Sequence, residues 1–230
     1  MRSAGTARMR MIIAPALAMT TLASAATAQL RSPQVPVAGA ALQVFFTAQG
    51  QAIDVATQQL DLQRASFAPS QAITLDVRVG LAIGRGLYNA SLATPPLYLI
   101  WPGAATTGWF VVASFRTLPT RLVVNLFDAN SNLAGTTTHL AGPPDPTNVG
   151  FYCQGPTDIV WSEDARNAGG QPRLLAFAAT GAHAGKTWFA CEATPGPGAD
   201  YADAIHLVGG TFTAVDVERS TWGELKRRFR

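Results

Sequence analysis

The sequence predicts an all-β protein, an antiparallel β-sandwich of Ig-like or jelly-roll-like type with a short amphipathic helix at its C-terminus. Apolar residues recur with a period of two, as in the run AITLDVRVGL, where one strand face would carry Ile73, Leu75, Val77 and Val79. Clusters of Gly, Pro, Asn and Asp separate such runs, and residues 40–217 show no convincing helical spacing. Many short strands between turns of this kind are typical of antiparallel sandwiches.

The expected strands follow one another along the chain without an internal repeat. They are the apolar runs at 41–48, 52–63, 72–81, 96–103, 108–118, 121–128, 158–164, 173–181, 186–194 and 205–215. The intervening turn clusters include TPP, DANSN, AGPPDPTN and RNAGGQP, whose residues favour tight turns for steric and hydrogen-bonding reasons.

Residues 1–28 have the features of an export signal peptide. Arg2, Arg8 and Arg10 flank the start of the apolar run MIIAPALAMTTL, and the triplet at 26–28, Ala-Thr-Ala, fits a small-x-small cleavage site. The apolar run is too short to span a bilayer as a stable helix. We therefore expect an exported chain that is not transmembrane and that resides in the periplasm, at the cell surface or outside the cell.

The rest of the chain is expected to divide into a linker at 29–39, a β-sandwich domain at 40–218 and a basic tail at 219–230. The formal charge is +3, and the three arginines of the signal peptide account for all of it. The tail holds five basic residues against one acidic residue, so the body of the mature chain is acidic. A nucleic-acid partner is excluded, because such binding needs a basic face with many phosphate contacts.

The tail is predicted to form an amphipathic helix that contacts a partner. Thr221 and Glu224 have the spacing of a capping box, and an apolar stripe with basic residues around it follows. A helix of this length needs a surface to pack on. That surface is the end of the sandwich itself, a surface, matrix or export-machinery protein, or an anionic membrane. The candidate partner-binding residues are Trp222, Leu225, Lys226, Arg227, Arg228 and Phe229.

Two cysteines, Cys153 and Cys191, are predicted to form a disulfide, because a cysteine pair in an exported protein usually oxidises. Closing a loop of that length would stabilise the fold by roughly 4 kcal/mol in the chain-entropy model. The alternative is a buried pair of free thiols.

The stretch FACEATPGPGADYADA is the candidate cation site. Glu192, Asp200 and Asp203 supply three carboxylates, and the Gly/Pro segment between them could turn backbone carbonyls toward an ion. Calcium prefers six to eight such oxygens, so calcium is the candidate cofactor. The alternative is a polar turn in which Asp200 and Asp203 cap the backbone before the next strand.

The same stretch resembles the signature of an uncharacterised family of exported bacterial β-domains, a domain of unknown function. That signature runs Phe/Trp-Glu-Asp, a glycine-rich gap, then Asp-x-Asp-Phe/Tyr-Asn-Asp and an apolar strand. Within residues 188–206 the matching positions are Glu192, Asp200, Tyr201 and Asp203, whereas Ala193, Gly198 and Ala202 differ. The resemblance implies an exported β-domain and does not imply an activity.

Motifs for catalysis are missing from the sequence. The three histidines are isolated in the sequence and belong to no zinc-binding pattern: they are His139, His183 and His206. The sequence also lacks the G-x-S-x-G motif that holds the nucleophilic serine of many hydrolases. Trp101, Trp109, Trp161 and Trp188 could stack on sugars if they were exposed, although they lie beside apolar runs.

We therefore expect a non-catalytic β-sandwich of the cell surface or periplasm, with an adhesion, matrix or assembly role. The alternatives are a carbohydrate-binding module that uses exposed aromatic side chains, and a hydrolase whose site no sequence motif marks. An exposed row of aromatic rings would favour the first alternative, and a cleft with paired carboxylates would favour the second.

Overall fold

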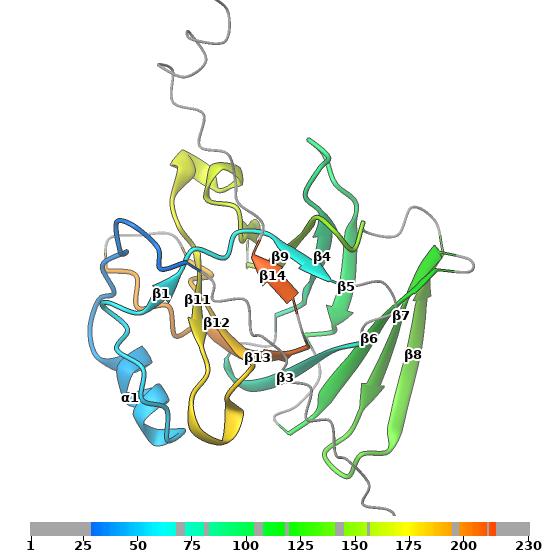
Figure 1. Cartoon of the computed structure of the whole chain (residues 1–230), viewed down its shortest axis with the longest axis horizontal. Helices are drawn as coiled ribbons and strands as arrows, with labels where there is room; N and C mark the ends of the chain where they lie inside the picture. The colour runs from blue at the N-terminus through cyan, green and yellow to red at the C-terminus, as the bar shows by residue number, and fades with distance from the viewer. Residues whose placement is uncertain are drawn as a thin grey trace, which may run out of the picture.

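The computed structural model describes residues 29–67, 72–80, 83–103, 108–117, 120–140, 145–155, 157–194, 198–210 and 212–214 (Figure 1). The predicted signal peptide at 1–28 and the predicted helix at 219–230 lie outside these ranges. Within them, the strands form two antiparallel sheets, and the one α-helix is short. The prediction of an all-β, antiparallel fold is confirmed.

Both sheets have an order that differs from the order of the chain. The large sheet contains β1 (Gln59–Leu60), β11 (Leu174–Ala178), β12 (Thr187–Cys191), β13 (Ala204–Gly209), β3 (Ala72–Gly80), β6 (Phe110–Thr117), β7 (Thr120–Phe127) and β8 (Leu133–His139), in this order. The small sheet contains β14 (Phe212–Ala214), β2 (Ala65–Phe67), β9 (Val149–Gln154), β4 (Arg85–Asn89) and β5 (Leu97–Trp101), with β10 (Ile159–Trp161) paired to β9.

The main hydrophobic core contains side chains from both sheets. Phe67 of β2 lies 5.7 Å from Phe115 of β6, and Phe151 of β9 lies 4.6 Å from Phe189 of β12, measured between ring centroids. Aromatic rings bury large apolar areas, so these contacts make the facing surfaces of the two sheets one core.

A second core lies on the other face of the large sheet and is covered by a helix, not by a strand. The run at 41–48 was expected to be a strand, but it forms helix α1 (Ala41–Ala48). Leu42, Phe45 and Phe46 have the i, i+3, i+4 spacing of one helix face, whereas Val44 points away and is 62% exposed. Phe46 packs edge-on against Phe177 of β11, at 5.1 Å. The prediction was wrong because an apolar run this short fits either period.

The expected linker at 29–39 packs against the domain. Leu30 forms a β-bridge with Leu60, and the amide of Arg31 donates to the carbonyl of Gln59 at 2.8 Å. Val35 and Val37 pack on the second core. These contacts cover the β1 edge of the large sheet. The opposite edge, β8, has no such cover from the described residues.

A third, smaller cluster covers the outer face of the small sheet. Tyr88 of β4 and Tyr152 of β9 meet Trp161 of β10 there. Two glycines make room for the tyrosines, because a Cβ on Gly150 would collide with the ring of Tyr88 and a Cβ on Gly86 with that of Tyr152. In both cases glycine and tyrosine are cross-strand partners in the β4–β9 ladder.

Candidate functional site

The acidic loop between β12 and β13 brings together two of the three carboxylates that were predicted to bind calcium, those of Glu192 and Asp203, whereas the carboxylate of Asp200 accepts from the amide of Ala202 at 2.9 Å. Backbone amides hold them. Glu192 accepts hydrogen bonds at Oε2 from the amides of Asp200 (3.1 Å) and Tyr201 (3.3 Å), and at Oε1 from that of Thr194 (3.2 Å). Asp203 accepts from the amide of Ala193 at 2.8 Å.

These contacts are those of a self-capped turn. Burial of Glu192 raises its pKa, and the neighbouring carboxyl of Asp203 raises it further, which indicates that the two side chains face each other. Among the described residues, which omit 195–197 of this loop, no group of three or more His, Cys, Asp or Glu side chains is arranged to hold a metal ion. The residues present therefore fit the polar-turn alternative better than the calcium site.

The predicted disulfide between Cys153 and Cys191 is not formed in the structure. Both residues are free cysteines with no exposed surface. They come from different sheets, β9 and β12, and their side chains are neighbours in the core between the sheets. The alternative that the sequence left open, a buried pair of thiols, is therefore the observed one.

The aromatic side chains do not form an exposed row. Trp101 and Trp188 are buried, Trp109 and Trp161 are partly buried, and no aromatic residue is among the large exposed apolar residues of the described chain. The carbohydrate-binding alternative needs solvent-facing rings, so this part of the molecule gives it no support.

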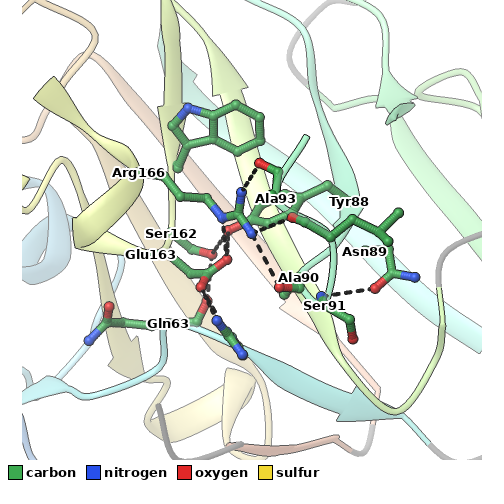
Figure 2. A network of polar contacts seen from close by, with 12 residues as sticks. Gln63, Tyr88, Asn89, Ala90, Ser91, Ala93, Ser162, Glu163 and Arg166 are labelled. Carbon is green, nitrogen blue, oxygen red and sulfur yellow. Dashed lines mark hydrogen bonds and ion pairs between the residues drawn. The ribbon is translucent and has the colours of Figure 1, made fainter. Parts of the chain in front are cut away.

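A buried carboxylate that sequence reasoning missed is the centre of the network in Figure 2. Glu163, 4% exposed, follows β10 and forms ion pairs with Arg64 and with Arg166. Tyr88 donates its hydroxyl proton to Oε2 of Glu163 at 2.9 Å. Ser162 donates to the carbonyl of Gln63 at 2.6 Å and accepts from a backbone amide.

Arg166 extends this network, which we call the Glu163 network, to the loop after β4. Its guanidinium donates to the carbonyls of Ala90 (3.2 Å), Leu92 (2.8 Å) and Ala93 (3.1 Å). It also lies over the rings of Tyr88 and Trp161, at 5.2 and 5.8 Å from their centroids. The sequence signal was available as Glu163 and Arg166 at i, i+3, but an isolated pair of that kind is common on protein surfaces.

The Glu163 network fits a structural role better than a catalytic one. Both oxygens of Glu163 face guanidinium groups, and the hydroxyl of Ser162 is committed to the backbone. A general base needs a lone pair free to accept a proton from substrate, and a nucleophilic serine needs a base beside it. Neither arrangement is present at this network.

A free sheet edge is the most exposed regular element of the described chain. Six of the seven residues of β8 are exposed, and only His139 at its end is partly covered. Strand β8 pairs with β7 on one side, and Figure 1 shows it at the right-hand side of the large sheet, with no labelled strand or helix beyond it. Leu133 and Leu140 at its two ends are 60% and 64% exposed.

Comparison of the chain with protein-family models, with curated proteins and with solved structures gave no match. The described residues contain no helix whose length and apolar character would let it cross a bilayer.

Proposed function

We propose that the protein is an exported, non-catalytic β-sandwich with an assembly role at the cell surface or in the periplasm, and that β8 is its contact strand. The observation that carries this proposal is the exposure of β8 on both faces and along its free edge. Such an edge offers a row of unpaired N–H and C=O groups to another strand. Adhesion and matrix formation use the same kind of contact.

The sequence of β8 lacks the charged residues and prolines that usually protect an edge, and its one irregularity, a register shift opposite Leu126 and Phe127, lies at its start. Residues 129–144 contain no Lys, Arg, Asp or Glu, and β8 itself contains no proline. Its centre is Thr136-Thr137-Thr138, and threonine favours strands. Charged residues and prolines on an edge prevent pairing between molecules, so their absence favours strand addition here.

The occupant that these features favour is a second copy of the chain. Two β8 strands that pair antiparallel about a two-fold axis bring no like charges together, because neither strand carries a charged residue other than His139 when that histidine is protonated. Closed two-fold pairing is also the commonest form of homo-oligomer.

The test is the oligomeric state of the purified protein over a concentration series, measured by sedimentation velocity. We expect a concentration-dependent dimer that is lost in the double variant Thr137→Lys/Thr138→Lys, which puts ammonium groups on both faces of the edge. The matched control is Ala165→Lys, at an exposed position far along the chain from β8. A monomer at every concentration, or a dimer that survives the double variant, would overturn the proposal.

The basic tail is a second proposed contact element, motivated by its sequence alone. In the same measurement, deletion of 219–230 separates the two elements. If β8 is the contact strand, the deletion leaves the dimer intact, whereas loss of the dimer assigns the contact to the tail.

A further inference from the structure

One arginine lies in the middle of the core between the two sheets. Arg85 of β4 is 1% exposed and is the direct cross-strand partner of Cys153 on β9. Its Nη1 donates to the carbonyl of Ile83 at 3.3 Å, while Nε and Nη2 have no hydrogen-bond partner. A guanidinium keeps its charge in proteins, so a buried one needs an anionic neighbour.

The groups that face this guanidinium come from three strands. Cys153 of β9, Cys191 of β12 and His206 of β13 all interact with its charge, and Arg173 adds a second positive charge near Cys191. His206 is 2% exposed and stacks on Phe189, and its Nδ1 has no partner. Burial and the charge of Arg85 lower the pKa of His206, which keeps its ring neutral.

The thiols of Cys153 and Cys191 differ in how readily they lose a proton. The adjacent thiol of Cys191 lowers the pKa of Cys153, and the charge of Arg85 lowers it further. For Cys191, burial and the adjacent thiol of Cys153 raise the pKa. The register of β4 and β9 places Arg85 directly opposite Cys153, so a negative charge in this cluster belongs on the sulfur of Cys153 beside Arg85.

We propose that Cys153 and Cys191 form a redox pair between the two sheets, in which Cys153 is the attacking thiol, Cys191 the resolving thiol and Arg85 the charge that activates Cys153. The oxidant is hydrogen peroxide, because both thiols are fully buried and a small molecule reaches them faster than a protein or a bulky disulfide does. The proposal is independent of the contact at β8.

The chemistry balances in two steps. The thiolate of Cys153 attacks one oxygen of peroxide, the O–O bond breaks, and the leaving hydroxide takes up a proton to form water, which leaves a sulfenic acid. The sulfur of Cys191 then attacks that of Cys153, the S–O bond breaks, and a second water leaves with the thiol proton. The dithiol is oxidised to a disulfide, and one peroxide is reduced to two waters.

The new bond would tie β9 of the small sheet to β12 of the large sheet. Arg85 opposes it, because oxidation removes the anion that faces the buried guanidinium. A pair whose reduced form is stabilised in this way has a high reduction potential, so the bond should be reversible. Replacing Arg85 by an uncharged residue of similar length should make the disulfide harder to reduce.

The first experiment treats the folded full chain with peroxide and examines it by mass spectrometry. We expect the wild type to lose two hydrogens and both free thiols. Cys191→Ala should stop at a sulfenic acid on Cys153 that dimedone traps, whereas the matched variant Cys153→Ala should leave Cys191 unmodified at the same dose. Equal trapping in both variants, or thiol loss only at denaturant concentrations that unfold the chain, would overturn the proposal.

The second experiment equilibrates the protein with glutathione redox buffers. We expect Arg85→Met to shift the dithiol–disulfide equilibrium toward the disulfide by at least tenfold, or about 30 mV. Arg85→Lys, which retains a positive charge, should shift it less. An unchanged equilibrium in folded Arg85→Met would remove Arg85 from the proposal. If Arg85→Met does not fold, the comparison rests on Arg85→Lys and on the trapping asymmetry in the background that retains Arg85.

Discussion

At the scale of single residues, the buried polar side chains of this protein are held by specific hydrogen bonds. Glycines on neighbouring strands leave the space that these side chains occupy. Tyr88 is the clearest case. It has no exposed surface, donates to Glu163 and lies against Gly150. Burial and the nearby Glu163 both raise the pKa of Tyr88, so its hydroxyl stays protonated and remains a donor.

Gly150→Ala should destabilise the protein by roughly 1–3 kcal/mol, the usual range for overpacking in a core. The added methyl group would occupy the place of the Tyr88 ring and push its hydroxyl away from Glu163. Urea unfolding measures the change in free energy.

The matched control is Gly135→Ala on β8, where an added Cβ meets nothing within 4 Å. This variant should unfold at the same urea concentration as the wild type or at a higher one, because alanine reduces the entropy of the unfolded chain. Equal losses at both positions would contradict the steric argument.

At the scale of elements, helix α1 shows how tertiary contacts decide an ambiguous run. It carries no side-chain cap at its N-terminus, so its stability depends on the face that Leu42 and Phe46 bury against the large sheet.

Phe46→Ala should destabilise the protein by about 3–5 kcal/mol, since the ring is fully buried and packs on Phe177 and Trp188. Val44→Ala, on the exposed face of the same helix, should change the free energy of unfolding by no more than about 0.5 kcal/mol. Guanidinium unfolding checks both. If 41–48 packed as a strand, Val44 and Phe46 would share a face, and the two variants would lose similar amounts.

The strands that were missed lack the alternation of apolar and polar residues that marks a strand in sequence, each for its own physical reason. Strand β4 contains Arg85, and its neighbours Leu87 and Tyr88 are buried on opposite faces. Apolar and polar residues therefore do not alternate along it. Strand β8 is exposed on both faces and contains three threonines. Strand β9 is buried on both faces, which replaces alternation by a continuous buried run.

The candidate site residues, like the strands, could be predicted only in part. The spacing of Glu192, Asp200 and Asp203 indicated a shared loop but could not show that backbone amides would occupy the carboxylates. Likewise, Cys153 and Cys191 could be paired by counting, whereas Arg85 reaches them only through the β4–β9 register.

At the scale of the whole molecule, the segment after β10 connects parts that belong to different sheets. Asp164 forms an ion pair with Arg31 at 2.7 Å, and Arg31 in turn bonds the β1 edge of the large sheet. Its neighbour Glu163 holds Arg64, just before β2 of the small sheet, and Arg166. Breaking the Glu163 network should therefore weaken the protein as one unit.

Glu163→Gln keeps the shape of the side chain but leaves Arg64 and Arg166 without their counter-charge. Removing one partner of a fully buried ion pair costs about 3–5 kcal/mol. Both arginine side chains keep some exposure, 24% and 18%, so we expect roughly 2–3 kcal/mol, toward the values of screened pairs. Tyr88→Phe, which removes one hydrogen bond and keeps both ion pairs, should cost about 1 kcal/mol.

Urea unfolding followed by tryptophan fluorescence and by far-ultraviolet circular dichroism checks both the size and the cooperativity of this effect. Because the segment that holds Glu163 also bonds the large sheet through Asp164 and Arg31, the two probes should stay coincident in Glu163→Gln while the midpoint falls. Probes that separate would mean that the network holds only the outer face of the small sheet. A larger loss in Tyr88→Phe than in Glu163→Gln would place the stabilisation in the tyrosine hydrogen bond and its packing, and not in the paired charges.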